Sequence, residues 1–369
     1  MAYRTLNTLQ SGRALAALTV LLFHANNTLE LPKYLNRPVF PFLQSGNFGV
    51  QFFFVLSGFV VFLAHQKDIG RPGMLKTFFW KRFRRVYPPL WIVLLLIVPF
   101  YFLFPAFGKE GTRHADTILA AFMISPASYD PILTLEWTLR HEVLFYLIFS
   151  LLIWRRSLGV LVGTTWLLLS GIPSWLQLSF PLSFLFATNH LLFAFGIAAS
   201  YAYKRAVVGL RVARFAAGLG MGIFFVSWIA RWRHPFTHID FLDILFGLGS
   251  ALMLFAFAVI ERADAIRVPA LLIFLGEGSY SIYLTHYPVV SLITKVLVYH
   301  CSYLPAAAMF LIVSTVAMIA GVAFYLGVER PLISKLGSID VGSDSHVAGP
   351  ARASSASNST RLTEPDYES

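Results

Sequence analysis

Arg13 and His24 stand out first, because these two ionisable residues bracket ten residues that are almost entirely apolar. In a helix, eleven steps of about 100° complete three turns plus about 20°, so both side chains share one face. Their separation along the axis is about 16 Å, roughly half of a 30 Å hydrocarbon core. Ionisable groups inside a span are usually functional, and imidazole is a suitable general base near neutral pH. The alternative is that Arg13 reaches the headgroups and His24 marks the outer end of a short span.

A second candidate is the basic stretch "FFWKRFRRVYPPLW" at residues 78–91. Arg82 and Arg85 lie three positions apart in it and therefore share a helix face. Two guanidinium groups on one face can bind a phosphate-bearing ligand through paired hydrogen bonds. The stretch also fits an ordinary positively charged anchor with aromatic residues at the membrane boundary, so both interpretations stay open.

A third stretch, "LEWTLRHEVLFYLIF" at residues 135–149, places Glu142 directly after Arg140 and His141 and before an apolar run. A carboxylate in this position can orient an imidazole and stabilise it once it is protonated. It can equally belong to an ion-pair cluster at the membrane boundary. The sequence does not say which spans meet, so it does not decide between the two.

A fourth stretch, "FLGEGSYSIYLTHYP" at residues 274–288, contains Gly276 and Gly278 ahead of a span that carries His286. The glycines predict a helix break, and broken helices at membrane depth usually line a cavity. A single histidine such as His286 is more often a hydrogen-bonding residue between helices than a catalyst.

The elements that must position these residues are membrane spans. Of the 369 residues, 57% are hydrophobic and 13% are charged, and the mean hydropathy is +0.68. Soluble domains carry about 25% charged residues. The chain is therefore predicted to be an all-α integral membrane protein with about ten transmembrane helices. The predicted spans are 8–26, 47–64, 86–107, 137–154, 158–178, 184–203, 213–230, 241–260, 279–299 and 304–328.

The lysines and arginines of the loops predict the orientation. With the N-terminus in the cytosol, 21 of the 29 basic residues fall on the cytosolic side and 7 on the opposite side. This bias predicts that both termini are cytoplasmic. Residues 1–337 are expected to form one transmembrane domain. Residues 338–369 are polar and Ser-rich, and we expect a disordered cytoplasmic tail.

The net charge of +11 does not indicate nucleic-acid binding, because the basic residues gather in short loops between apolar spans. Cys301 is the only cysteine, which excludes an intramolecular disulfide. His234 and His238 have the spacing of metal ligands, but Pro235 interrupts them, and we predict no metal site.

In their order along the chain, these motifs resemble those of the membrane-bound acyltransferase 3 family. The resemblance covers about residues 5–335 and begins with Arg13 and His24. The chain departs from many relatives at Gln51, where they carry Asp, and at His141, where they carry a second acidic residue. The other matching motifs are "GVQFFFVLSGF" (49–59), "RFRRVYPP" (82–89), "EWTLRHEVLFYLIF" (136–149), "GEGSYSIYLTHYPVV" (276–290) and "VERPL" (328–332).

The resemblance implies a multi-pass enzyme of the inner (plasma) membrane that transfers an acyl group, usually acetyl from acetyl-CoA, to a hydroxyl. The exopolysaccharide O-acetyltransferases are the most similar subtype, judged from "TLRHEVLFY". His24 would take the proton of the acceptor hydroxyl or carry the acyl group transiently. Arg13 would hold the donor or polarise its carbonyl, and Glu142 would orient His24.

The same resemblance implies the binding residues. Arg82 and Arg85 would bind the phosphates of acyl-CoA, which is a co-substrate and not a permanently bound cofactor. His286, Tyr283 and Trp137 are predicted to contact the substrate. The acceptor would be a carbohydrate or a lipid-linked saccharide of the cell envelope, reached among membrane lipids.

A transporter or flippase of a lipid-linked sugar or small anion is the alternative function. Ten spans, buried ionisable groups and a broken helix suit it equally well. Binding of acetyl-CoA separates the two, because a transporter has no need of it. A sensor or scaffold would explain the spans, but gives no reason for Arg13 and His24 to share a face.

Overall fold

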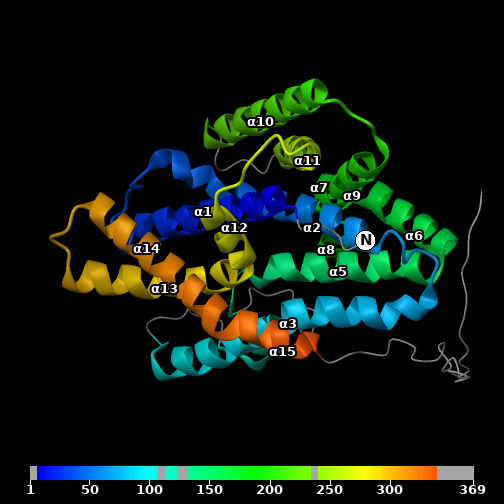
Figure 1. Cartoon of the computed structure of the whole chain (residues 1–369). Coiled ribbons are helices and arrows are strands. Elements are labelled where there is room, and N and C mark those ends of the chain that lie inside the picture. The colour runs from blue at the N-terminus through cyan, green and yellow to red at the C-terminus, as the bar shows by residue number, and fades with distance from the viewer. Residues whose placement is uncertain (1–5, 106–112, 124–131, 134, 234–239, 339–369) are drawn as a thin grey trace, which may run out of the picture.

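The computed structural model describes residues 6–105, 113–123, 132–133, 135–233 and 240–338. Within these ranges the chain is helical and has no strand (Figure 1). The elements are α1 (Asn7–Glu30), η1 (Pro41–Phe48), α2 (Gly49–His65), η2 (Pro72–Met74), α3 (Leu75–Leu103), α4 (Ala115–Ala121), α5 (Glu136–Trp154), α6 (Arg156–Leu169), α7 (Ile172–Leu176), α8 (Leu182–Leu185), α9 (His190–Arg205), α10 (Leu210–Arg233), α11 (Asp240–Arg262), α12 (Ala270–Glu277), α13 (Ser279–His300), α14 (Ala306–Phe324), the π-helical η4 (Tyr325–Glu329) and α15 (Arg330–Gly337).

Among the described residues, eight helical segments are long and apolar enough to cross a membrane. This confirms an all-α integral membrane protein, and each of the eight coincides with a predicted span. The first predicted span corresponds to the 24-residue helix α1. Helix α1 is not one of the eight segments, because the polar residues at both of its ends lower its mean hydropathy. Of the predicted tail, only residue 338 is described; residues 339–369 and the histidines at 234 and 238 lie outside the described ranges.

The fifth predicted span, residues 158–178, is shorter than expected. Helix α6 has 14 residues and ends at Leu169, which gives a length of about 21 Å against a hydrocarbon core of about 30 Å. Gly171 follows with φ = 94°, a backbone conformation that favours glycine. The apolar run therefore continues into the separate short helix α7, which sequence periodicity did not reveal.

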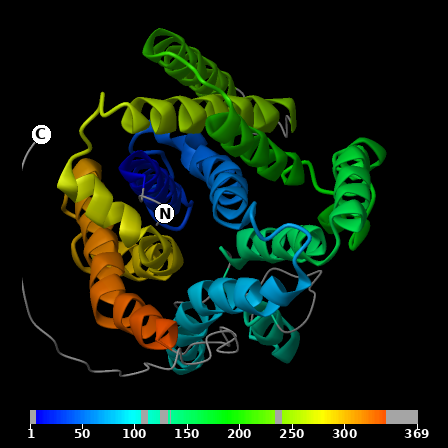
Figure 2. The ribbon, with the colours of Figure 1, turned by 45° about the vertical axis from the view of Figure 1, so that its right-hand side comes forward.

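Helix α1 lies inside the bundle, in contact with α2, α11, α12, α13 and α14 (Figure 2). Its first turn is held by Glu261 at the end of α11. The carboxylate accepts hydrogen bonds from the backbone N–H groups of Asn7 and Thr8, at 2.7 and 2.8 Å, and from the Thr8 hydroxyl at 2.6 Å. Glu261 thus satisfies donors that every helix N-terminus leaves unpaired.

Helix α2 packs against α9 through glycines. A Cβ on Gly58 would lie 2.1 Å from the Phe193 carbonyl oxygen, and one on Gly196 would lie 1.9 Å from that of Val55. Small residues let membrane helices approach backbone to backbone. This close contact fixes how α2 is rotated about its axis, and with it the direction in which the neighbouring Ser57 points.

The course of the backbone shows where the basic residues of α3 lie and where the helix before α13 is broken. Helix α3 begins at Leu75, well before the predicted span, and continues through Pro88 and Pro89, so Arg82 and Arg85 lie on the helix itself. The predicted break at Gly276 and Gly278 is confirmed, because α12 ends at Glu277 and α13 begins at Ser279.

In Figure 1, α1 begins and α15 ends near the middle of the view, each at the right-hand end of its helix. The loop charges predict that both ends face the same side of the membrane. Which side of the membrane they face stays a prediction.

Candidate functional site

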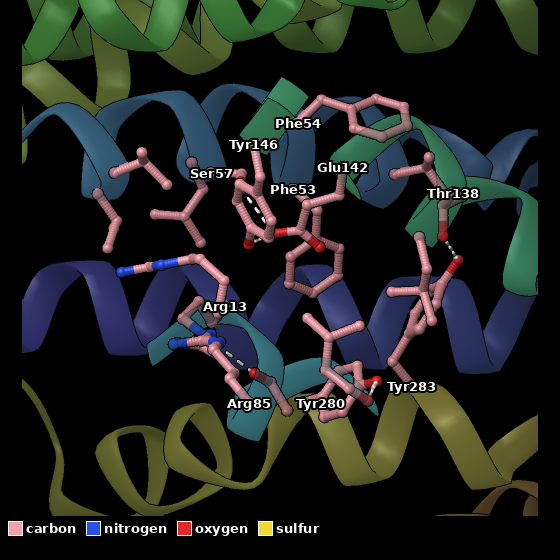
Figure 3. A pocket seen from close by; sticks show the side chains of 18 residues that line it. Arg13, Phe53, Phe54, Ser57, Arg85, Thr138, Glu142, Tyr146, Tyr280 and Tyr283 are labelled. Atoms are coloured by element: carbon pink, nitrogen blue, oxygen red, sulfur yellow. Dashed lines mark hydrogen bonds between the residues drawn. The ribbon is translucent and has the colours of Figure 1, made fainter. Parts of the chain in front are cut away.

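A small cavity of about 90 Å³ lies between α1, α2, α3, α5 and α13. Five of the predicted site residues line it, although they come from four different helices. Arginines lie at one end of it, and Thr138 and Tyr283 lie at the other (Figure 3). The five are Arg13, Arg82, Arg85, Glu142 and Tyr283.

A larger cavity of about 450 Å³ lies between α1, α2, α10 and α11 and is almost entirely apolar. The hydroxyls that line it are already bonded within the protein. Thr8 donates to Glu261, Ser11 to the Thr8 carbonyl, and Thr19 to carbonyls of its own helix. The smaller cavity is therefore the candidate site, because it holds the reactive groups.

Arg13 and His24 both contact α13, which confirms that they share a face of α1. The Nε of Arg13 donates to the Ser279 hydroxyl at 3.0 Å. The His24 ring lies 5.3 Å from the His286 ring, measured between centroids. Arg13 thus points into the bundle and does not extend toward the headgroups.

Glu142 is held by two hydroxyls. Its Oε1 accepts a hydrogen bond from Ser57 at 2.7 Å and a second one from Tyr146. Among the hydrogen bonds of the described residues, none joins Glu142 to His24. The predicted orientation of His24 by this carboxylate therefore has no counterpart in the structure, and Glu142 belongs to the arginine-lined cavity instead.

His24 and His286 form a separate pair toward the other end of α1. His286 is fully buried, and its Nδ1 lies 3.1 Å from the Ile282 carbonyl oxygen, so this nitrogen carries the proton. Its Nε2 is buried without a hydrogen-bond partner in the described part of the chain. Tyr287 adds an edge-on ring contact to His24, with centroids 5.1 Å apart.

An apolar layer separates the cavity from this histidine pair. Val20, Leu135 and Tyr283 form a buried cluster, and Val50, Phe53 and Tyr287 pack against it. Tyr283 reaches both sides, because it lines the cavity and its ring centroid lies 5.8 Å from that of His286. Its hydroxyl is hydrogen-bonded to Thr138 Oγ1 at 2.9 Å.

Trp137 is not brought to the cavity. Its side chain is 40% exposed and contacts the rings of Phe54 and His141, with centroids 6.3 and 5.7 Å apart. His141 also turns away from the cavity, and its Nδ1 lies 2.8 Å from Nε2 of His190. A contact between Trp137 and the substrate stays a prediction.

Sequence reasoning missed Ser57, Tyr146 and Glu329 as members of this region. Glu329 accepts hydrogen bonds from the backbone N–H and the hydroxyl of Ser281, so it anchors the helix start that carries Ser279. Each of the three lies in a motif singled out above, but its partner is on another helix. The motifs identified the stretches that contain these three residues, but they did not predict which side chain on another helix each residue contacts.

Gln51 stands where many relatives carry Asp, yet a carboxylate does lie beside it. Gln51 Nε2 donates to Asp243 on α11 at 3.0 Å, and Arg231 on α10 donates to the same oxygen at 2.9 Å. The acidic group at this point is thus supplied by a different helix.

The family profile described as "Acyltransferase domain" (acyltransferase 3) matches residues 6–326. The exopolysaccharide production protein ExoZ of Rhizobium meliloti is 27% identical over 310 residues, which are 79% of this chain and 90% of that protein. The peptidoglycan O-acetyltransferase OatA of Listeria monocytogenes is 24% identical over 330 residues, 77% of this chain, and the match spans about half (49%) of OatA.

No solved structure matches the chain significantly. The family match covers most of the chain and includes all eight predicted site residues. The chain therefore belongs to the acyltransferase 3 family and is a membrane acyltransferase.

Proposed function

We propose that this acyltransferase moves an acetyl group from acetyl-CoA to a hydroxyl of a cell-envelope or exported carbohydrate, in the inner (plasma) membrane. The two relatives support the acceptor class, because their names refer to exopolysaccharide production and peptidoglycan O-acetylation. A lipid-linked saccharide falls in the same class of acceptor.

The observation that carries the proposal is the convergence of Arg13, Arg82 and Arg85 on one cavity. Coenzyme A is a polyanion, and guanidinium groups bind phosphates through paired, charge-assisted hydrogen bonds. A cavity of about 90 Å³ is small beside the roughly 300–1,000 Å³ of pockets that bury whole drug-sized ligands. It suits the acyl end of the thioester, with the nucleotide held outside among the basic residues of α3.

In the proposed reaction, His24 takes the proton of the acceptor hydroxyl as its oxygen attacks the thioester carbonyl carbon. Arg13 lies about 16 Å from His24 along α1, so it holds the donor at the arginine-lined end of the cavity and does not contact the reacting carbonyl. The C–S bond then breaks, and the leaving thiolate receives the proton that His24 holds. Because the Tyr283 layer separates His24 from the cavity, this layer must open for transfer.

The test uses the full chain, purified in detergent, with acetyl-CoA and succinyl-CoA as donors. We expect acetyl-CoA to bind, and the double variant Arg82→Ala/Arg85→Ala to weaken binding by at least tenfold, because hydrogen bonds to charged groups contribute about 1.5–3 kcal/mol each. His24→Ala should abolish transfer but leave donor binding intact. His300→Ala, at an exposed position, is the control.

Three outcomes would contradict the proposal. A wild-type protein that binds neither donor points to a transporter or to another acyl donor. A His24→Ala variant that acetylates at the normal rate removes His24 from the chemistry. Binding of succinyl-CoA but not of acetyl-CoA would mean that the transferred group is succinyl, while Arg82 and Arg85 would remain the proposed donor-binding residues.

A further inference from the structure

A short chain of hydrogen bonds lies at the edge of the arginine-lined cavity. It links Asp68 to His65 and His65 to Arg82. His65 Nδ1 lies 2.8 Å from Asp68 Oδ2, and His65 Nε2 lies 3.3 Å from a terminal nitrogen of Arg82. His65 is only 2% exposed. Asp68 and His65 are not among the residues that the family motifs quoted above contain.

The chemistry of the partners fixes the state of the imidazole. A guanidinium has no acceptor, so His65 Nε2 must accept from Arg82. An ionised carboxylate has no donor, so His65 Nδ1 must carry the proton that is shared with Asp68. The neutral imidazole with the proton on Nδ1 satisfies both contacts. In the same way, carboxylates that do not touch the metal orient the histidines that bind it in metal sites.

Arg82 is oriented from other directions as well. Its guanidinium carbon lies 5.9 Å from the Phe78 ring centroid and 5.6 Å from that of Tyr146, distances that allow cation–π contacts. Its Nε is buried and has no hydrogen-bond partner in the described part of the chain. Arg82 therefore lines the cavity in a fixed direction. One terminal nitrogen is engaged by His65, and the guanidinium has further N–H donors for an anionic ligand.

The segment that carries Asp68 is itself tied down. The N–H of Asp68 donates to the His65 carbonyl at 2.9 Å, and the N–H of Gly70 donates to the Leu152 carbonyl of α5 at 2.9 Å. The turn after α2 is thereby attached to the end of α5. A fixed turn holds the carboxylate, the carboxylate holds the imidazole, and the imidazole holds the guanidinium.

We propose that His65 and Asp68 are positioning residues that hold Arg82 in the orientation that binds the phosphate groups of the donor. The inference rests on the proposed function, because it takes Arg82 as a donor-binding residue. The competing explanation is purely structural: the contacts would only join the end of α2 to α3, and His65 would matter through its packing against Phe78, at 5.0 Å between ring centroids.

Substitutions at position 65 separate the two explanations. His65→Phe keeps a ring of similar shape against Phe78 but removes both hydrogen bonds. His65→Gln keeps an acceptor near the position of Nε2 and can still reach Arg82. We expect His65→Phe to raise the Kd and KM for acetyl-CoA by on the order of tenfold, with kcat nearly unchanged, and His65→Gln to restore most of the affinity.

The experiment measures the Kd of acetyl-CoA on the full chain in nanodiscs, together with KM, kcat and the thermal midpoint. His300→Phe, the same exchange at an exposed site, is the matched control. A double-mutant cycle completes the test. In an Arg82→Ala background, His65→Phe should cause no further loss of affinity, because the side chain that it positions is absent.

The possible results are distinct. If Arg82→Ala weakens donor binding but His65→Phe does not, the positioning role is wrong and the proposed function stands. If His65→Phe lowers the thermal midpoint and has the same effect on Kd with or without Arg82, the contact is purely structural. If the wild-type chain does not bind acetyl-CoA, the proposed donor fails and this inference fails with it.

Discussion

Tyr283 and Thr138 are joined by a 2.9 Å hydrogen bond between their hydroxyls, at the end of the cavity opposite to Arg13 and Arg85 (Figure 3). Tyr283 belongs to the apolar layer between the cavity and His24. In the proposed reaction, an acyl group that moves from the arginines toward His24 passes this pair.

Thr138→Val removes the hydroxyl and keeps the shape of the side chain. It should therefore loosen the apolar layer around Tyr283 without leaving a void. One neutral hydrogen bond contributes about 1 kcal/mol, so acetyl-CoA hydrolysis in the absence of acceptor should rise by up to about fivefold. The rate of hydrolysis is measured by the release of the CoA thiol. Thr19→Val, at the wall of the other cavity, is the control. An unchanged rate of hydrolysis would mean that the layer opens by another movement.

Arg13→Lys keeps the positive charge but loses the Nε–H that Ser279 accepts and the planar donor geometry of a guanidinium. We expect kcat/KM for transfer to fall at least tenfold, since a hydrogen bond to a charged group contributes about 1.5–3 kcal/mol. Ser279→Ala should have a smaller effect, because it removes only the partner. Wild-type activity in Arg13→Lys would show that charge alone suffices.

Glu142→Gln removes the charge on which the Ser57 and Tyr146 hydroxyls converge. Both bonds are charge-assisted, so the free energy of unfolding should fall by about 1–3 kcal/mol. Tyr146→Phe, which removes one donor and keeps the carboxylate, should cost less. Thermal unfolding in detergent measures the difference. Equal midpoints for Glu142→Gln and the wild type would contradict the role of this carboxylate in holding the cavity together.

Glu261→Ala leaves the N–H groups of Asn7 and Thr8 without their carboxylate partner. Loss of a helix cap costs about 0.5–2 kcal/mol, and the first turn of α1 should exchange its amide hydrogens faster. Glu261→Gln keeps one acceptor oxygen and should fall between the alanine variant and the wild type. Unchanged exchange in the first turn would show that packing alone orders this end of α1.

Much of the framework was predictable from local sequence. The face shared by Arg13 and His24 follows from helix geometry, and the break at Gly276 and Gly278 follows from the glycines. The extent of the apolar runs located the spans, because a bilayer demands a minimum length. These features depend on residues within a few turns of one another.

The pairings between helices were not predictable in the same way. Glu142 was expected to orient His24, but it is bonded to Ser57 and Tyr146. The length of α6 also differed, because the helix ends where the backbone turns at Gly171 and not where the apolar run ends. Contacts of this kind depend on which spans pack together, and hydropathy carries no information on that choice.

The bond between Arg13 and Ser279 joins residues that are 266 positions apart. At about 5–20 residues per second, a ribosome needs roughly 15–50 s to make the intervening chain. Helix α1 enters the membrane early and must wait this long for α13, which supplies the partners of both Arg13 and His24. The order of synthesis therefore delays reactivity, since the site cannot be assembled until nearly all of the bundle has been inserted.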